Sequence, residues 1–186
     1  MSKPSRQTWV ALLRGINVTG NNMIPMARLR VLCEEIGWAD VRTYIQSGNI
    51  VFTSTATSKE KLETRLGEAI EDRFGLTPAV IVRSRVAWPR YVESNPFPGP
   101  SKKAPSHVLM GVSKSKPNPG AEMELRSRAA NGERVRLVGD ALWVHYAGGV
   151  AGSKLSSSVV DRAVGSPVTM RNWNTVRKIT ALALGL

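Results

Sequence analysis

The hydrophobic and polar positions at the start of the chain predict a buried strand followed by a helix. The run TWVALLRG is almost continuously apolar and ends at a glycine, which is typical of a strand that is buried on both faces. Apolar residues then recur at helical spacing at Leu29, Leu32, Cys33 and Ile36. Pro25 suits the first turn of this helix. We therefore expect a central strand with a helix packed on its sheet.

Alternating residues after this helix predict a hairpin. DVRTYIQ alternates with a period of two, and the chain resumes as NIVFTS after the turn residues Ser47 and Gly48. Thr57 and Glu60 have the spacing of a capping box, and apolar residues within 62–74 line one face of a second helix. AVIVR then adds a strand. The order strand, helix, strand, strand, helix, strand is that of the split βαβ arrangement in ferredoxin-like folds.

The same order of elements recurs after a proline-rich segment. Residues 94–106 contain four prolines, which lack amide donors, and are predicted to form a connector without regular structure. Further elements follow this segment: the strand HVLMGV, a helix at 119–130, a hairpin around Gly139, another helix, the strand VTMR and a C-terminal helix. We therefore predict an α+β protein with two ferredoxin-like subdomains in tandem, 7–93 and 107–186, the second including the C-terminal helix. The duplication is one of architecture rather than of sequence.

Composition indicates a folded protein inside the cell. Apolar residues make up 42% of the chain and charged residues 22%, the usual mix of a globular protein. No stretch approaches the roughly 20 apolar residues that cross a bilayer, so no membrane partner is expected. The single Cys33 cannot form an internal disulfide, which fits a reducing compartment. We therefore expect a cytoplasmic protein in which Cys33 is a buried apolar residue rather than a nucleophile.

The charge of the chain favours partners that carry phosphate groups. The net charge is +12, and residues 94–186 hold 13 basic against 5 acidic residues, compared with 13 against 9 in residues 1–93. Such an excess attracts polyanions over long distances. A basic surface that is simply solvated remains the alternative.

The first candidate for ligand binding is the loop that follows the first strand. Arg14 and Asn17 stand at the exit of a central strand, where side chains and loop amides commonly meet ligands. The glycines at 15 and 20 are spaced as in a phosphate-binding loop, but Asn21 and Asn22 replace the Lys and Ser or Thr that would contact phosphate and magnesium. A nucleoside-triphosphatase loop is therefore rejected. A turn that needs glycine conformations and asparagine caps is the alternative.

The second candidate is the first hairpin turn. Gln46, Ser47 and Asn49 offer amide and hydroxyl groups that could orient a polar ligand. The geometry of a turn would select the same residue types without any ligand, so this alternative stays open.

The third candidate is the glycine-rich segment GGVAGSK at 148–154. It is expected to follow a strand and to open a helix, which would direct free backbone amides and Lys154 at one point, as in an anion site. The segment is not a Walker motif, because Ser153 precedes the lysine and the glycine spacing is one residue short. A helix capped by Ser153 after a flexible loop is the alternative.

The fourth candidate combines a planar cation, two amides and an indole in the segment RNWNT. Arg171, Asn172 and Asn174 would bind and orient an anion, although either asparagine could equally cap the last helix. His107 and His145 each fall on a predicted strand, where either a base or a structural histidine is conceivable. No spacing of residues indicates zinc or magnesium, so neither a metal nor a cofactor is expected.

Five separated motifs resemble a known bacterial family. LLRGINVTGNN, RTYIQSGNIVF, NPF, GSKL and RNWNTV occur in the order and spacing of the family called domain of unknown function 1697, from about Trp9 to about Leu182. This resemblance implies two ferredoxin-like subdomains and no established activity. The chain departs from the family's pattern in its first loop, where Asn21 and Met23 stand at positions that are commonly basic.

The sequence therefore predicts a small anionic or phosphate-bearing ligand in a polar site shared by the two halves. Arg14, Lys154 and Arg171 would hold the anion, and the asparagines and Gln46 would orient it. An RNA- or DNA-binding module that uses the basic surface is the alternative, because ferredoxin-like sheets also bind RNA. Whether the protein is an enzyme is left open, since no nucleophile with its base is evident. The sequence does not indicate an oligomeric state.

Overall fold

The computed structural model describes residues 5–18, 20 and 22–186, and their contacts divide the chain into two compact units. The first unit contains residues 1–89 together with 179–186, and the second contains residues 90–178. Each unit is an antiparallel four-stranded sheet with helices, which confirms the predicted α+β class.

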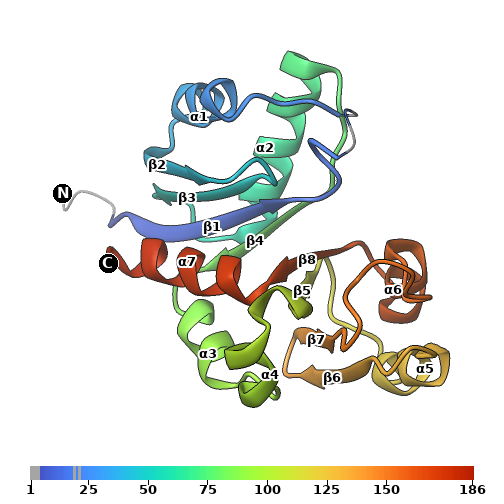
Figure 1. Cartoon of the computed structure of the whole chain (residues 1–186). Helices are drawn as coiled ribbons and strands as arrows, with labels where there is room; N and C mark the ends of the chain where they lie inside the picture. The colour runs from blue at the N-terminus through green and yellow to red at the C-terminus, as the bar shows by residue number, and fades with distance from the viewer. Residues whose placement is uncertain (1–4, 19, 21) are drawn as a thin grey trace. The chain divides into compact units, whose positions relative to one another are not determined.

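The first unit follows the predicted order of elements (Figure 1). Its sheet has the strand order β2-β3-β1-β4, so the strands that a helix connects are not neighbours. The elements are β1 (Gln7–Leu13), α1 (Met26–Glu35), β2 (Ala39–Tyr44), β3 (Asn49–Ser54), α2 (Lys59–Phe74) and β4 (Val80–Ser84). The central strand β1 is buried from Trp9 to Leu13, as its apolar run predicts.

Helices α1 and α2 cover one face of the first sheet, because their apolar stripes and alternate strand residues form one core (Figure 1). Leu29 and Leu66, one from each helix, are fully buried there. Trp38 stacks on Phe52 with a ring separation of 3.6 Å. Cys33 is buried in this core, and burial raises the pKa of its thiol to about 12. The thiol is therefore protonated at neutral pH and is a poor nucleophile.

The second unit repeats the order of elements with the strand order β6-β7-β5-β8. Its elements are β5 (Val108–Ser113), α5 (Ala121–Arg128), β6 (Arg134–Val138), β7 (Ala141–His145), α6 (Ser157–Val164) and β8 (Val168–Asn172). Helix α7 (Trp173–Leu184) follows, and residues 179–186 at its end group with the first unit. No helix in the described part of the chain is long and apolar enough to cross a membrane.

The proline-rich segment forms regular structure, and the prediction of an irregular connector was wrong. It contains α4 (Pro98–Lys103) and a 3-10 turn, η1 (Pro105–His107). Pro98 and Pro105 stand in the first turn of their helices, where a missing amide proton costs nothing because no partner exists for it. The short helix α3 (Ala87–Glu93) was also not predicted.

The starts of two further helices differ from the prediction. Helix α2 has Ser58 rather than Thr57 at its N-cap, and the Ser58 hydroxyl bonds to the Glu60 carboxylate at 2.6 Å instead of capping the backbone. Helix α6 begins at Ser157 with Ser156 as its cap, so the segment 148–154 ends before the helix starts. The expectation that this segment opens a helix was therefore wrong.

Candidate functional site

The loop after β1 is held together by the side chain of Asn17. Its Nδ2 donates hydrogen bonds to the carbonyls of Ile24 at 3.0 Å and Gln46 at 2.7 Å, and its Oδ1 accepts one from the Ile24 amide at 2.7 Å. Asn17 itself has a φ of 53°, in the left-handed region that asparagine tolerates better than most residues. The amide is thus used inside the protein, and it links the first two motifs.

The first hairpin turn has a similar internal network. Asn49 is almost fully buried, and its Nδ2 donates to the Tyr44 carbonyl and the Ser47 hydroxyl, both at 2.9 Å. Gly48 has a φ of 72°, and a Cβ placed on it would lie 2.7 Å from Leu13 Cβ. Only glycine satisfies both conditions, so the geometry of the turn explains Gly48.

Arg14 and Gln46 are the remaining described residues of the first two candidates, and both are at least partly exposed. Arg14 is half-buried directly after β1, and its backbone amide bonds to the Ala79 carbonyl at 3.0 Å. The side chain of Gln46 is exposed. Asn21, on which part of the comparison with phosphate loops depends, lies outside the described residues.

The segment 148–154 forms a loop that is attached to a carboxylate. Ser153 donates from its hydroxyl to Glu133 Oε1 at 2.5 Å and accepts from the Leu155 amide at 3.1 Å. This bond from Ser153 is the main cause of the lowered pKa of Glu133, which therefore stays ionised. A negative charge beside Ser153 disfavours a second anion there. Lys154 is exposed.

Arg171 lies on β8, an edge strand of the second sheet, and its side chain is buried. Its Nη1 donates to Thr169 Oγ1 at 2.7 Å and to the Met170 carbonyl at 2.9 Å. Burial lowers the pKa of the guanidinium to about 10, so it remains charged at neutral pH. Asn172 accepts the Thr175 amide at 3.0 Å and caps α7, whereas Asn174 is exposed.

The structure therefore brings together only some of the predicted site residues. Asn17 reaches the backbone of Gln46, and Ser47 reaches Asn49, within the first unit. In the second unit, Ser153 is tied to Glu133 and Arg171 to its own strand. The expectation of one site shared by both halves stays a prediction.

A cavity that the sequence analysis did not single out lies in the second unit. We call it the His145 pocket. It has a volume of about 250 Å³ and is lined by one lysine, two histidines and small apolar residues, namely Gly99, Pro100, Lys103, Ala104, His107, His145 and Ala147. Lys103 comes from α4, His107 from η1 and His145 from the end of β7. Among the described residues, none that lines the pocket is acidic.

The pairing of β5 with β7 explains why the two histidines meet. Val108 stands opposite His145 in the register, and the Tyr146 amide donates to the His107 carbonyl at 2.8 Å, so the two strands stay paired one residue further. Gly149, in the predicted anion loop, has a φ of 85° and brings its backbone against His107. Part of that loop thus borders the pocket.

His145 has an unusual environment for a side chain on a sheet. Its Nδ1 is buried and has no hydrogen-bond partner among the residues that the structure describes. Burial, followed by electrostatic repulsion from Arg134 and His107, lowers the pKa of its imidazole below the usual value. His145 is therefore neutral at neutral pH, and a bound anion would favour its protonated form.

The NPF motif forms part of the surroundings of His145. Asn95 accepts the Phe97 amide at 2.9 Å and donates to Ser101 Oγ at 2.8 Å, which fixes the entry to α4. The buried Phe97 ring lies 5.9 Å from the His145 ring. The Arg134 guanidinium lies over the Phe97 ring, 5.0 Å from its centre. The motif thereby holds an aromatic ring next to His145, with a cation on that ring.

Sequence reasoning missed Lys103 because it treated 94–106 as a connector. The signal that could have found the pocket is the pairing of HVLMGV with ALWVHY, which places the two histidines at the same end of adjacent strands. Within the described residues, no group of three or more His, Cys, Asp and Glu side chains could hold a metal ion.

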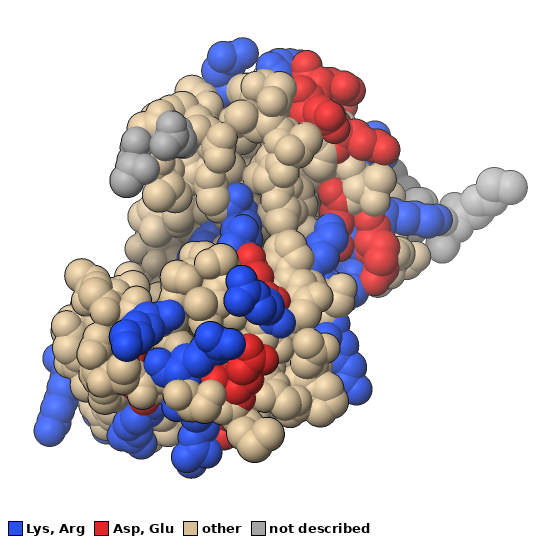
Figure 2. Space-filling model, turned by 90° about the vertical axis from the view of Figure 1, so that its right-hand side faces the viewer, with Lys and Arg blue, Asp and Glu red and all other residues tan. Residues whose placement is uncertain are grey.

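Positive charge also gathers on the outer surface of the second unit. Residues 90–178 carry 14 Lys and Arg against 6 Asp and Glu. Figure 2, which views the side where α5 and α6 lie in Figure 1, shows basic side chains predominating over this unit. Arg126, Arg134 and Arg136 line a second hollow of about 220 Å³ together with Glu133.

Comparisons with known proteins support the family resemblance and the fold. A model of the family described as protein of unknown function (DUF1697) matches residues 6–143, so the motifs GSKL and RNWNTV lie beyond the matched range. A solved structure of a conserved bacterial protein from Streptococcus pneumoniae is similar over 96% of this chain and 99% of its own, with 22% identity and a TM-score of 0.70. This likeness shows the fold alone. No curated protein matches the sequence.

Proposed function

Because the chain belongs to the DUF1697 family, whose description names no activity, we propose from its own residues that it binds a small organic anion in the His145 pocket. The composition of this pocket supports the proposal most directly: Lys103, His107 and His145 line it, and no carboxylate does among the residues that the structure describes. Such a cavity stabilises negative charge, and the neighbouring Arg134 adds to the positive potential.

The apolar part of the lining supports an organic rather than an inorganic anion. Pro100, Ala104 and Ala147 provide apolar walls, and binding pockets typically combine such walls with a few polar groups that fix orientation. The volume of about 250 Å³ limits the ligand to a small molecule. The unpartnered Nδ1 of His145 is consistent with a site that is preorganised for a ligand rather than for stability.

Replacing Lys103 by alanine is expected to weaken binding of phenyl phosphate about tenfold, the scale of a hydrogen bond to a charged group. Isothermal titration calorimetry on the purified chain measures this. Phenol serves as the uncharged analogue and inorganic phosphate as the anion without an apolar part, and both should bind more weakly than phenyl phosphate.

The matched control is the replacement of Lys102 by alanine. Lys102 precedes Lys103 on α4 and is exposed, but it does not line the pocket. The control removes the same charge, so it separates a specific contact from a change in overall potential. Equal losses in both variants, or no binding of phenyl phosphate at all, would contradict the proposed site.

Nucleic acid binding is the second candidate function, and the basic surface of the second unit favours it (Figure 2). Arg126 and Arg136 weaken this case, because both form ion pairs with Glu122, at 3.5 Å and 3.0 Å. A nucleic acid ligand would lose affinity steeply as salt rises, whereas the Lys103 substitution would have little effect on it. Fluorescence anisotropy with a labelled oligonucleotide at several salt concentrations separates the two functions.

We also propose the ferredoxin-like topology for both units. The strand orders β2-β3-β1-β4 and β6-β7-β5-β8 support it, since each places the two helix-connected strand pairs with another strand between them. A cytoplasmic location is proposed as well. The buried, protonated thiol of Cys33 fits a compartment in which disulfides are rare.

A further inference from the structure

Another cavity lies in the first unit, at the edge of its sheet. It has a volume of about 480 Å³ and opens beside β2, which is an edge strand. Polar residues of three strands and Glu34 of α1 line it together with apolar residues. The residues that matter here are Thr8, Asp40, Arg42, Val51 and Thr53. We call it the β2 hollow.

A β-bulge shapes the β2 hollow. The register of β2 against β3 shifts between Ala39 and Arg42, and Asp40 adopts a φ of 52° within the shift. Because Ala39 pairs with Thr53 and Arg42 with Val51, two residues of β2 stand opposite a single residue of β3. Bulges of this kind redirect side chains.

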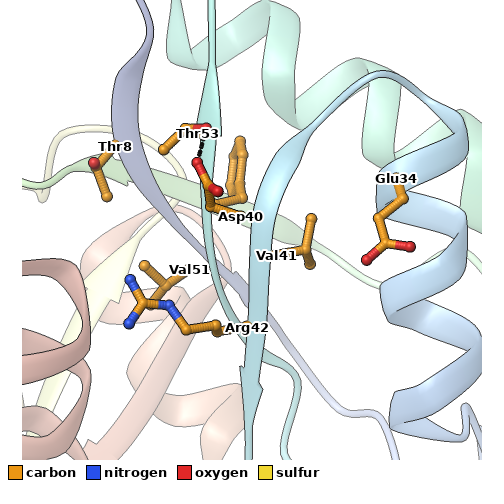
Figure 3. Close-up of a pocket in the computed structure, with 8 residues that line it drawn as sticks. Thr8, Glu34, Asp40, Val41, Arg42, Val51 and Thr53 are labelled. Atoms are coloured by element: carbon orange, nitrogen blue, oxygen red, sulfur yellow. Dashed lines mark hydrogen bonds between the residues drawn. The ribbon is translucent and has the colours of Figure 1, made fainter. Parts of the chain in front are cut away.

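The bulge places two opposite charges on the same side of β2. In Figure 3 the Asp40 carboxylate and the Arg42 guanidinium both lie on the side of β2 away from Glu34 and Val41. The Asp40 carboxylate is fixed by a hydrogen bond from Thr53 Oγ1 at 2.9 Å. Thr8 adds another hydroxyl near the same end (Figure 3).

Neither charge is neutralised inside the protein. In the described part of the chain, no ion pair involves Asp40 or Arg42, although the two residues are only two positions apart. A carboxylate and a guanidinium that share a cavity without pairing can each take up a group of opposite charge from one ligand. Val51, nearly fully buried, provides an apolar surface between them.

We propose that the β2 hollow binds a free α-amino acid with a small apolar side chain. Asp40 and the neighbouring hydroxyls take the ammonium group, Arg42 takes the carboxylate, and Val51 contacts the side chain. This proposal concerns the first unit and does not depend on the anion pocket of the second.

The test uses three related probes, each at ~10 mM, a concentration suited to weak binding. L-valine carries both charges, L-valinamide carries only the ammonium group, and N-acetyl-L-valine carries only the carboxylate. Chemical-shift changes of the backbone amides in β2 and β3 on the full chain report binding. We expect L-valine to shift these signals saturably, and each half-charged analogue to bind about ten- to hundredfold more weakly, because each loses one charge-assisted contact.

Two conservative variants identify the residues. Asp40→Asn removes the charge but keeps an acceptor for Thr53 and tolerates the left-handed backbone, so the fold is retained. Arg42→Gln removes the guanidinium. Each variant should bind L-valine about tenfold more weakly, or weaker still. Asp72→Asn and Lys61→Gln change exposed charges on α2, which contributes none of the described residues that line the hollow, and should leave binding unchanged.

Three outcomes would overturn the proposal. Equal binding of N-acetyl-L-valine would reduce the hollow to an anion site at Arg42, and equal binding of L-valinamide would reduce it to a cation site at Asp40. Absence of saturable shifts with L-valine would remove the site altogether. None of these results would affect the test with phenyl phosphate, because that test measures binding to the His145 pocket of the second unit.

Discussion

Replacing Gly48 by alanine is expected to destabilise the protein by about 3 kcal/mol, from the cost of a left-handed backbone and from overpacking. Gly48 is buried with a φ of 72°, and an added Cβ would lie 2.7 Å from Leu13 Cβ and 2.8 Å from Ile16 Cδ1. These neighbours belong to the central strand and to the loop after it, and neither can move without disturbing the core. Urea denaturation followed by circular dichroism measures the loss.

Gly75→Ala provides the control for this prediction. Gly75 ends α2 with a φ of 66°, and nothing lies within 4 Å of a Cβ placed on it. The substitution carries the backbone cost alone, about 1 kcal/mol. If both variants lose the same stability, the close approach of Gly48 to Leu13 and Ile16 has no energetic weight and the account of the turn is wrong.

Replacing Asn17 by alanine is expected to lower the free energy of unfolding by about 2–4 kcal/mol. The change removes three hydrogen bonds, leaves the amide of the buried Ile24 without its acceptor, and puts alanine at a φ of 53°. The same denaturation experiment measures it. The loss should be larger than for any other substitution confined to the 14–24 loop that keeps the core intact.

Asn22→Ala is the matched comparison for Asn17. Asn22 has a φ of 52° and is exposed, and its side chain makes one hydrogen bond, to the Gly15 carbonyl at 3.0 Å. Asn22→Ala should lower the free energy of unfolding by about 1 kcal/mol, mostly because alanine is less stable in the left-handed backbone conformation. Similar losses in the two variants would mean that the link from Asn17 to Gln46 does not stabilise the loop.

Patterns that repeat along the chain were predictable, because burial imposes a period on the sequence. The apolar run of β1 and the stripe at Leu29, Leu32 and Cys33 became buried elements as expected. The turn residues Gly48 and Gly139 also mark real turns, since both adopt a positive φ. The element order of both units follows from these features.

Helix starts and the pocket were not predictable from local pattern. Whether Thr57 or Ser58 caps α2 depends on where the backbone turns, and both residue types suit a cap. Proline was taken as a breaker at 94–106, but its effect depends on its position within the first turn of α4. The His145 pocket joins α4 to the end of β7, a contact that only the three-dimensional structure supplies.

Several predicted binding residues have structural roles inside the protein, and their role in ligand binding stays a prediction. Asn17, Asn49 and Asn172 use their amides for turns and a cap, which is the alternative that residue type alone left open. Arg171 is buried against its own strand. A polar residue at the end of an element therefore indicates a candidate, and its hydrogen-bond partners decide how much of it is left for a ligand.

The most direct test of the proposed function is the pH dependence of anion binding. Benzenesulfonate suits this test because its own charge does not change near neutral pH. His145 has a lowered pKa in the free protein, and an anion in the pocket would raise it, so binding takes up a proton. The affinity should therefore increase as pH falls from the pKa of His145 in the complex toward its lower pKa in the free protein, by at most tenfold per pH unit for one proton.

Isothermal titration calorimetry of benzenesulfonate between pH 7.5 and 5.5, a range of about two units around the ordinary pKa of histidine, compares the wild-type chain with His145→Gln. The account predicts tighter binding at low pH in the wild type and a much smaller increase in the variant. An affinity that does not change with pH in the wild type, or that increases equally in both proteins, would contradict it.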